Sequence, residues 1–370
     1  MTGYKHLFQR ALAAAPERLH FAAHSHHLWP DASYVGQLAA WEDGVRLADR
    51  KWERVMGEIW PAAQAHVAAE LGLPDPGTLV FAPNTHTLLL AIASALPRRP
   101  LRILASDGEF HSFRRQAARW EEAGTAIVER APLDRIVERA TAGGHDLIFV
   151  SQVQFGTGHV LGDIAALAAL ARPDGPWVVI DGYHGFMAME TDLSAVADRI
   201  FYLAGGYKYA MAGEGCAFLH APPGFGARPE ITGWYAEFED LSLPPGSIGY
   251  APDGRRFLGA TFDPSGIYRF VAVRDMLRQE GLTTAGIAAH VDGLRAQLLA
   301  ALPIEAELLN PDSPARFLAL RSPNAQRWKA ALEAKDVITD VRGDVLRIGF
   351  GLYQDMRDVT RLIEALSELR

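Results

Sequence analysis

Two strand ends in this sequence carry residue types that suit carbonyl–amine chemistry. WVVIDGYHG ends an apolar run with Asp181 and places His184 three residues on, and FYLAGGYKY ends another with two glycines before Lys208. A lysine amine can form a Schiff base with an aldehyde cofactor, and a carboxylate from a neighbouring strand can keep a pyridine nitrogen protonated. Taken alone, Asp181 reads as a helix-capping carboxylate and Lys208 as a solvated lysine. Together they favour a pyridoxal 5'-phosphate (PLP) site.

Two further strand ends carry residues suited to a planar, phosphorylated cofactor. VFAPNTHTLLLAI places Asn84, Thr85 and His86 between a strand and a helix, so that backbone N–H groups and the threonine hydroxyl can bind an anion at the helix N-terminus. ASDGEFHSFRRQ offers Phe110 and His111, either of which can stack on a ring. Plainer interpretations exist for both stretches, namely an Asn/Thr helix cap in the first and a phenylalanine packed under a helix in the second.

Further motifs complete a pattern that extends from about residue 80 to 360: VSQVQFGTGHVLGDI, GWY, RRFLGATFDPSG and VLRIGFGLYQDMRDV. With them, the sequence resembles the class V group of fold-type I PLP-dependent enzymes, and within that group it is most similar to kynureninase. The resemblance implies Lys208 as the Schiff-base lysine, Asp181 as the pyridinium partner and His184 beside the cofactor oxygen or carboxylate. It also implies PLP as cofactor, a small-molecule amino-acid substrate and a homodimer with shared active sites.

The resemblance implies a full set of cofactor-binding residues: Asn84, Thr85, His86, Phe110, Asp181, His184, Tyr207, Lys208 and Thr261. Thr85, the backbone of His86 and Tyr207 would hold the phosphate, and Phe110 would stack on the ring. In such enzymes a Gly-Thr turn from the second subunit completes the phosphate site. The turn here reads Gly-Ala-Thr, so that an alanine precedes the candidate Thr261.

The substrate side of the predicted site comes from distant parts of the chain. Arg347, in the alternating stretch VLRIGF, matches the arginine that grips the substrate carboxylate, and its forked guanidinium suits a bidentate contact. A surface strand arginine is the alternative. AAHSHHLWP matches a segment that folds across the active-site mouth, with His24 where asparagine is common and Ser25 at a matching serine. We predict that these residues, with His26 and Trp234, bind substrate; a solvated loop is the alternative for the histidine segment.

The closely spaced His24, His26 and His27 also raise a remote alternative, a metal-dependent hydrolase. They lie too close together on an irregular segment, and no HExxH or third-ligand pattern accompanies them. We therefore predict no metal site.

The sequence leaves two reactions of the class possible, a kynureninase-type hydrolysis and a transamination. In a kynureninase-type hydrolysis Lys208 removes the α-proton and Cβ–Cγ cleavage releases alanine and an aromatic acid, whereas a class V aminotransferase needs only the proton transfers and hydrolysis.

A cysteine desulfurase needs a nucleophilic cysteine on a mobile loop, but Cys216 lies in the apolar run GCAFLH. Where kynureninases usually have two tryptophans followed by histidine, GWYAEF has Tyr235 and Glu237. A silent scaffold is disfavoured because the lysine, aspartate and arginine are all present, and no GxGxxG supports a nicotinamide site.

These residues need a sheet whose strands end side by side. Apolar runs predict strands at 78–83, 101–106, 146–153, 176–182, 199–206 and 215–222, and helical stretches, for instance 85–96, 111–123 and 163–172, alternate with them. Functional groups of such sheets gather at the carboxyl ends of the strands. We predict an α/β fold of the fold-type I PLP-dependent transferase kind, with a mostly parallel sheet in a large domain and a smaller α+β C-terminal domain.

Three parts are predicted along the chain: an N-terminal segment over the active site (1–45), a large PLP-binding domain with a substrate loop (46–262) and a small C-terminal domain (263–370). The loop is the Gly/Pro-rich passage DLSLPPGSIGYAPDGRRFLGATFDPSG, which is too irregular for a helix or a strand.

Composition limits which partners and which cellular compartment we expect for this protein. The 370 residues carry a net charge of −8, which disfavours a nucleic-acid partner. Cys216 is the single cysteine, so no intrachain disulfide can form. The first residues, MTGYKHLFQRALAAAPERLHF, lack the apolar core of a signal peptide, and TLLLAIASALP is too short to span a bilayer. We predict a cytoplasmic protein with no membrane partner.

Overall fold

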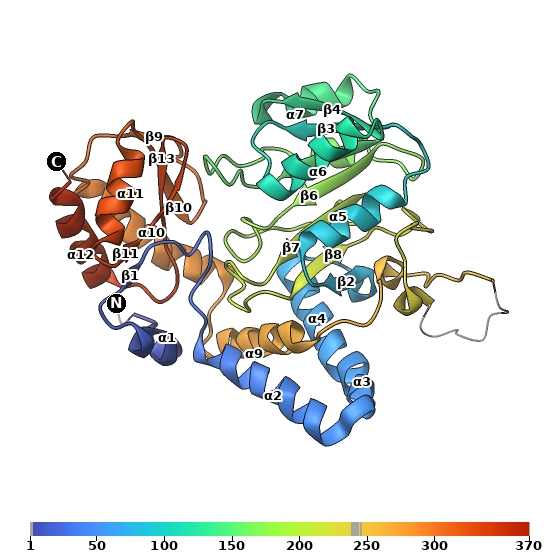
Figure 1. Cartoon of the computed structure of the whole chain (residues 1–370), viewed down its shortest axis with the longest axis horizontal. Helices are drawn as coiled ribbons and strands as arrows, with labels where there is room; N and C mark the ends of the chain where they lie inside the picture. Colours follow the sequence, from blue (N-terminus) through green and yellow to red (C-terminus); the bar gives the residue numbers. More distant parts are fainter. Residues whose placement is uncertain (1–2, 238–243, 245, 370) are drawn as a thin grey trace.

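A large sheet sets the frame of the molecule (Figure 1). The computed structural model describes residues 3–237, 244 and 246–369, and within them a seven-stranded sheet has the order β2-β8-β7-β6-β5-β3-β4. Its strands are β2 (Leu79–Ala82), β3 (Leu101–Ser106), β4 (Ala126–Ala131), β5 (Leu147–Ser151), β6 (Trp177–Asp181), β7 (Ile200–Gly205) and β8 (Ala217–His220). Strands β3 to β7 run parallel, and β8 is antiparallel to both β7 and β2. The prediction of a mostly parallel sheet is confirmed.

Helices cover the sheet, and the central strands β5 and β7 are buried at every position because both of their faces are packed. The helices of this domain are α4 (Trp60–Leu71), α5 (Thr85–Ser94), α6 (His111–Glu122), α7 (Ile136–Thr141) and α8 (Ile164–Ala168). The last of these is shorter than the predicted 163–172. Strand β4 was not predicted, because its sequence AIVERA puts charged residues at an edge of the sheet.

The small domain has its own antiparallel sheet, of order β12-β13-β10-β9, and its own apolar core. Its strands are β9 (Glu307–Leu308), β10 (Phe317–Arg321), β12 (Asp340–Arg342) and β13 (Val345–Gly349), and its helices are α10 (Thr284–Ala300), α11 (Ala325–Glu333) and α12 (Met356–Ser367). Apolar side chains of all three helices, among them Leu294, Trp328 and Leu362, pack into this core. The sheet faces the large domain through β10 and β13 residues that matter for the site described below.

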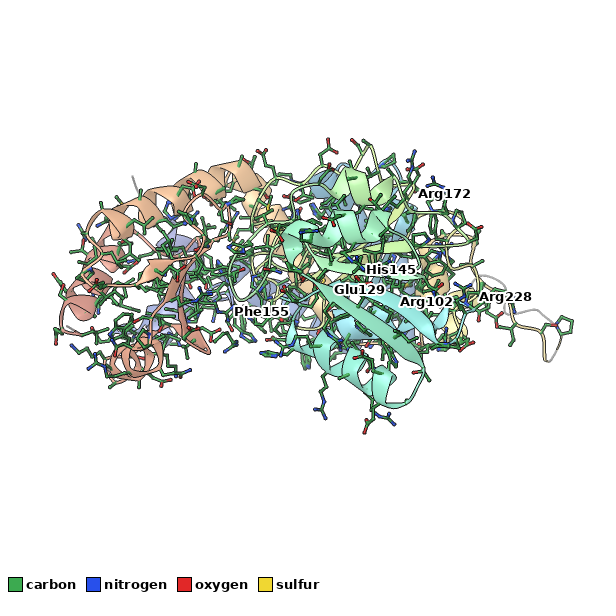
Figure 2. All side chains as sticks on the ribbon, turned by 90° about the horizontal axis from the view of Figure 1, so that it is seen from above. Arg102, Glu129, His145, Phe155, Arg172 and Arg228 are labelled. Atoms are coloured by element: carbon green, nitrogen blue, oxygen red, sulfur yellow. The ribbon has the colours of Figure 1, made fainter. Side chains whose placement is uncertain are left out.

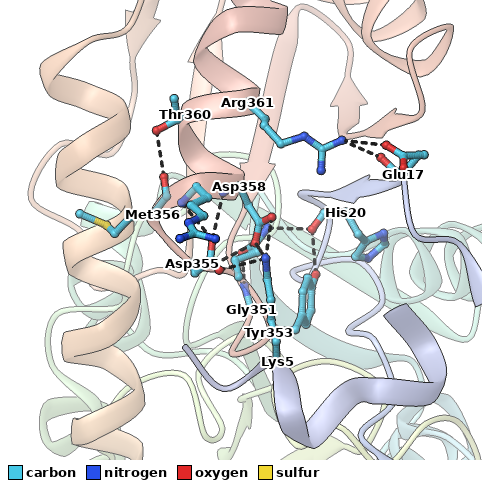
Figure 3. Close-up of polar contacts among 12 residues, drawn as sticks. Lys5, Glu17, His20, Gly351, Tyr353, Asp355, Met356, Asp358, Thr360 and Arg361 are labelled. Atoms are coloured by element: carbon cyan, nitrogen blue, oxygen red, sulfur yellow. Dashed lines mark hydrogen bonds and ion pairs between the residues drawn. The ribbon is translucent and has the colours of Figure 1, made fainter. Parts of the chain in front are cut away.

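The N-terminal segment is fastened to the small domain. It contains η1 (Lys5–Phe8), α1 (Gln9–Ala14) and β1 (Leu19–His20), which pairs in parallel with β11 (Val337–Ile338). The Lys5 ammonium lies 3.0 Å from the Asp355 carboxylate and 2.8 Å from that of Asp358, and the Tyr353 hydroxyl donates to the His20 carbonyl over 2.9 Å (Figure 3). The chain then crosses to the large domain, where the His27 N–H donates to the Tyr207 carbonyl at 3.0 Å. The histidine segment therefore bridges the two domains.

Helix α2 (Asp31–Leu47) follows this segment and packs along α9 (Ser265–Gln279). The contact is close because Gly36 has no side chain: a Cβ there would lie 2.6 Å from the Tyr268 carbonyl oxygen. The opposite side of α2 exposes large apolar side chains: Tyr34, Val35, Leu38, Trp41 and Val45.

Short helical turns complete the described chain: η2 (Ala48–Arg50), α3 (Lys51–Arg54), the π-helical η3 (Val55–Ile59), η4 (Pro76–Thr78), η5 (Leu133–Arg135), η6 (Trp234–Glu237) and η7 (Gly254–Phe257). In the predicted substrate loop, residues 240–243 and 245 lie outside the described residues, as does Phe238 of GWYAEF. No helix in the described part of the chain is both long and apolar enough to cross a membrane.

Candidate active site

The predicted lysine and aspartate come together at the carboxyl ends of two adjacent parallel strands. Asp181 is the last residue of β6, where it pairs in register with Leu203 of β7, and Lys208 follows the end of β7. Both side chains are shielded from water and interact electrostatically. The Asp181 carboxylate accepts a hydrogen bond from the Tyr183 N–H at 3.0 Å, and the Lys208 ammonium lies 4.6 Å from the centre of the Tyr183 ring. The strand-end geometry predicted from sequence is present.

Burial sets the protonation of this pair. It lowers the pKa of Lys208, with the attraction of Asp181 opposing the change and the charges of Arg347 and Arg342 adding to it. It also raises the pKa of Asp181. The Lys208 Nζ and the His184 Nε2 lie 2.7 Å apart, and burial lowers the pKa of His184 far enough to keep its ring neutral. The lysine is thus shifted toward the neutral, nucleophilic amine.

A cavity of about 1230 Å³ opens beside this pair. It is lined by all the predicted cofactor-binding residues but Thr261, namely Asn84, Thr85, His86, Phe110, Asp181, His184, Tyr207 and Lys208. These residues come from four separate strand ends, and the sheet order brings them to one place.

The N-terminus of α5 forms one end of the cavity. The Asn84 side chain accepts a hydrogen bond from the Thr87 N–H at 2.9 Å, so this asparagine caps the helix. The N–H groups of Thr85 and His86 have no intrahelical partner, as in any first turn, and suit an anion. The His86 Nδ1 is buried and has no hydrogen-bond partner among the described residues. This end of the cavity fits a phosphate group.

Phe110 lies in the cavity wall before α6, with its ring centre 5.6 Å from the Lys208 Nζ. Its ring meets that of Phe155 edge-on, with centroids 5.3 Å apart. An aromatic face at this distance from the lysine suits stacking on a planar ring.

Glu109, the residue before Phe110, was missed by the sequence reasoning. Its carboxyl group is fully buried and accepts hydrogen bonds from the Ser106 hydroxyl at 2.5 Å, the Ser151 N–H at 2.9 Å and the Ser151 hydroxyl at 2.5 Å. Burial raises its pKa to about 7 against these hydrogen bonds, and the nearby Asp181 adds to the rise. The buried carboxyl group ties the ends of β3 and β5 together. An acidic residue after a strand ordinarily indicates an exposed turn, so the sequence alone carries no signal for this role.

Arg347 is buried behind Phe155, one of the residues that line the cavity. Its guanidinium forms an ion pair with Asp340, donates to the Phe155 carbonyl and lies 5.7 Å from the centres of both the Phe155 and the Phe317 rings. Figure 2 places Phe155 on the side of the large domain that faces the small one.

The histidine segment places its members in three different surroundings. His24 is fully buried and stacks on Phe317, with ring centres 5.0 Å apart; it lies deeper than the rim position predicted for it. His26 is exposed, stacks on Tyr207 at 5.0 Å, and its Nδ1 lies 3.3 Å from the Ser25 hydroxyl.

His27 is buried on the far side of the segment. Its Nδ1 lies 2.7 Å from the Leu28 carbonyl oxygen, and its Nε2 accepts from the Leu352 N–H at 3.3 Å. The three imidazoles of the segment do not converge, and no metal-ligating group of His, Cys, Asp or Glu occurs within the described ranges. The metal-dependent hydrolase has no support from this geometry.

Trp234 and Thr261 lie outside the cavity of their own chain. Both are exposed, and the Trp234 Nε1 donates to the Thr261 hydroxyl at 3.3 Å. Cys216 is buried, and burial raises its pKa to about 12.

The cavity residues fit PLP in chemistry as well as in position. They supply an amine shifted toward neutrality, a buried carboxylate whose pKa a cationic ring would restore, an aromatic wall and an anion-binding helix end.

Comparison with known proteins gives matches to the sequence and to the fold. The family model of the kynureninase C-terminal domain matches residues 291–366. A probable cysteine desulfurase from Vibrio cholerae is 24% identical over 343 residues, covering 82% of this chain and 81% of the relative. Among solved structures, the cystine C-S lyase C-DES in complex with cysteine persulfide superposes with a TM-score of 0.82 at 17% identity, covering 96% of this chain and 99% of that one. The cysteine desulfurase CsdA from Escherichia coli gives 0.81 at 17% identity, covering 99% and 97%.

Fold and site together point to one class: the chain has the fold of the fold-type I, class V PLP-dependent enzymes, and its cavity residues fit that cofactor. The predictions of the fold class and of the cofactor are confirmed. The matched family model is that of kynureninase, whereas the matched relative is named a probable cysteine desulfurase.

Proposed function

We propose that the chain acts on a kynurenine-type amino acid by a kynureninase-like hydrolysis of the Cβ–Cγ bond, which releases alanine and an aromatic acid. The observation that carries the cofactor chemistry is the buried Lys208 amine beside Asp181. The match to the kynureninase C-terminal domain, which includes Arg347, favours this reaction over others of the class.

PLP, when bound, supplies an electron sink that stabilises negative charge at the substrate α-carbon. In this proposal Lys208 would hold the cofactor covalently, and Asp181 would keep a proton on the pyridine nitrogen. The first turn of α5, with Thr85, would hold the phosphate, and Phe110 would offer its aromatic face to the ring. Each of these residues lines the same cavity, which supports the assignment.

Proton transfer falls to Lys208. Its amine is shifted toward the neutral form that can accept the α-proton, and the 2.7 Å contact with the neutral His184 ring orients it. The overall hydrolysis consumes one water: the hydroxyl ends on the γ-carbon, which leaves as the acid, and a proton ends on the β-carbon, which leaves as alanine.

The single cysteine of the sequence argues against sulfur transfer. A desulfurase passes sulfur to a nucleophilic cysteine, and Cys216, the single cysteine of the sequence, is buried with its pKa raised to about 12. A thiol in that state is neither ionised at neutral pH nor within reach of the cavity, which it does not line. We therefore propose hydrolysis in preference to desulfuration, even though a curated relative bears the desulfurase name.

Cofactor binding is tested first. Purified protein loaded with PLP should absorb in the visible region, and borohydride should fix the cofactor to the chain at Lys208. Lys208→Ala should lose the borohydride-stable link, whereas Lys329→Ala, which removes a partly exposed lysine paired with Glu333, should keep it. Failure of the purified protein to bind PLP would contradict the proposal.

The reaction is tested next with kynurenine and related γ-keto amino acids. Equal amounts of alanine and aromatic acid are expected. Keto-acid formation that depends on added pyruvate, without alanine from the substrate carbon chain, would instead show an aminotransferase. Sulfide release from cysteine would contradict the argument from Cys216.

A homodimer with shared sites remains part of the proposal. Trp234 and Thr261 are exposed, hydrogen-bonded to each other and outside their own cavity, so they would act in the site of a second subunit. The apolar side chains exposed on α2, Tyr34, Val35, Leu38, Trp41 and Val45, support burial against another chain. Light scattering should give twice the 40.4 kDa chain mass, and a monomeric mass would contradict the shared site.

A further inference from the structure

A second, smaller cavity lies between the N-terminal segment and the small domain, and Figure 3 shows polar contacts of the residues around it. Its volume is about 230 Å³, and no described residue lines both this small cavity and the large cavity beside Lys208. One wall comes from α1 and β1, and the other comes from residues 353–361, which include the start of α12. An apolar cavity of about 150 Å³ is enough to hold benzene, so the small cavity has room for a molecule with a single ring.

Apolar side chains make up much of the wall of the small cavity. They are Leu12, Ala15, Pro16, Leu19, Phe21 and Leu28. Two polar members of the wall, Tyr353 and Gln354, already have partners, because both side chains donate to the His20 carbonyl, over 2.9 and 2.7 Å. The walls therefore suit a ligand with an apolar body.

Three cationic side chains among the described residues line the small cavity: Lys5, Arg18 and Arg361. Lys5 is held by the two carboxylates at the start of α12, and Arg361 lies 3.5 Å from the Glu17 carboxylate (Figure 3). Arg18 differs from both, since it has no carboxylate partner within the described part of the chain. Its guanidinium donates to the Ala11 carbonyl over 3.4 Å, a long hydrogen bond.

The surroundings of Arg18 leave most of its donors unused. The residue is half-buried, and a guanidinium has five N–H donors, of which the contact with Ala11 uses one. Burial lowers the pKa of the neighbouring His20, the hydrogen bond to the His26 carbonyl opposes this change and the charge of Arg18 adds to it, so the His20 ring is neutral at neutral pH. Polar groups in such surroundings normally have partners, and spare cationic donors beside an apolar wall therefore indicate an anionic ligand.

We propose that the small cavity binds a small carboxylate with an apolar body, which Arg18 holds through its forked donors while the body packs against Leu19 and Phe21. A carboxylate of this kind fits better than a phosphate or sulfate ion, because a bare ion would leave the apolar walls uncovered. The site is separate from the large cavity, and its occupancy does not depend on the reaction proposed above.

A ligand in the small cavity would also steady the histidine segment. The Nε2 of His20, in the cavity wall, donates to the His26 carbonyl at 2.8 Å. The His26 ring stacks on Tyr207, which lines the large cavity, and the His27 N–H donates to the Tyr207 carbonyl. A carboxylate held against β1 would therefore oppose local opening of residues 20–27, which connect the two cavities.

The test uses PLP-loaded protein and benzoate, with benzamide as its uncharged match of similar shape. Calorimetry should show that benzoate binds and that benzamide binds at least about tenfold more weakly. Arg18→Gln should weaken benzoate binding by roughly tenfold to a hundredfold, whereas Arg357→Gln, which changes an exposed arginine of α12 outside the cavity, should leave it unchanged. Absence of benzoate binding, or equal affinity of the native protein and Arg18→Gln, overturns the proposal.

A second variant and a second measurement separate a binding site from a structural role of Arg18. Ala15→Leu keeps Arg18 but fills part of the cavity, so it should also weaken benzoate binding; full affinity in this variant would contradict the assignment of the cavity. At benzoate ten times its Kd, amide hydrogen exchange of residues 20–27 should slow by up to roughly tenfold in the native protein and not in Arg18→Gln. Exchange that benzoate leaves unchanged in the native protein overturns the link to the histidine segment. Visible absorbance reports cofactor binding separately, so failure of the proposed function is recognised independently.

Discussion

Glu109 offers a direct test of how burial controls charge in this site. Its carboxyl group is fully buried against Ser106 and Ser151, and its pKa is raised from an ordinary 4.5 to about 7. Because the folded-state pKa lies above the unfolded one, folding favours the protonated form. The resulting stabilisation is complete below about pH 4.5 and is lost as the pH rises through about 7.

Glu109→Gln keeps the shape and hydrogen-bonding capacity of the side chain but cannot ionise. The free energy of unfolding of the variant, minus that of the native chain, should therefore grow by roughly 2–3 kcal/mol between about pH 5 and about pH 8. Urea unfolding curves at the two pH values measure this difference, with Glu305→Gln, an exposed carboxylate, as the control that should show none. A difference for Glu109→Gln that does not change with pH would refute the reasoning.

Three further substitutions test separate parts of the site. Gly349→Ala should lower the free energy of unfolding by about 1–3 kcal/mol in urea curves, because its methyl group overlaps the His24 ring. Asp181→Asn should weaken PLP binding by roughly a hundredfold in absorbance titrations, because the bound ring would lack its buried counter-charge; unchanged affinity would contradict that pairing. Arg347→Lys should weaken 3-phenylpropionate binding by about tenfold or more while leaving PLP absorbance intact, because lysine lacks the guanidinium fork.

The sequence was sufficient for features that depend on local pattern. Apolar runs ending in Asp181 or in the glycines before Lys208 indicated strand ends, and parallel strands bring such ends together. The helix cap at Asn84 was also readable, since an asparagine before a helical run has few other uses. These signals identified the cofactor side of the cavity.

The sequence does not predict features that depend on how strands align with each other or on how deeply a side chain is buried. The pairing of Asp340 with Arg347 follows from the alignment of β12 with β13, which no periodicity in the sequence reveals. Glu109 is buried only because Ser106 and Ser151, one of them 42 residues away, meet its carboxyl group. His24 was placed at the rim because the resemblance gave its order along the chain and not its depth.

Three carboxyl groups of this region, the buried Glu109 and the partly buried Asp181 and Asp340, can be explained by the same physical argument. The pKa of Asp340 is held low by His24 and by the charges of Arg347 and Arg342 despite burial, whereas burial raises the pKa of Glu109 and Asp181. Asp181 differs from the other two in that neither a full counter-charge nor a pair of hydroxyl donors meets it; its hydrogen bond comes from a single backbone N–H. A buried carboxylate in that position is costly unless a cation comes to it, and a protonated pyridine ring is such a cation. The same charge imbalance that makes the pair of Asp181 and Lys208 costly by itself therefore favours binding of a cationic ring.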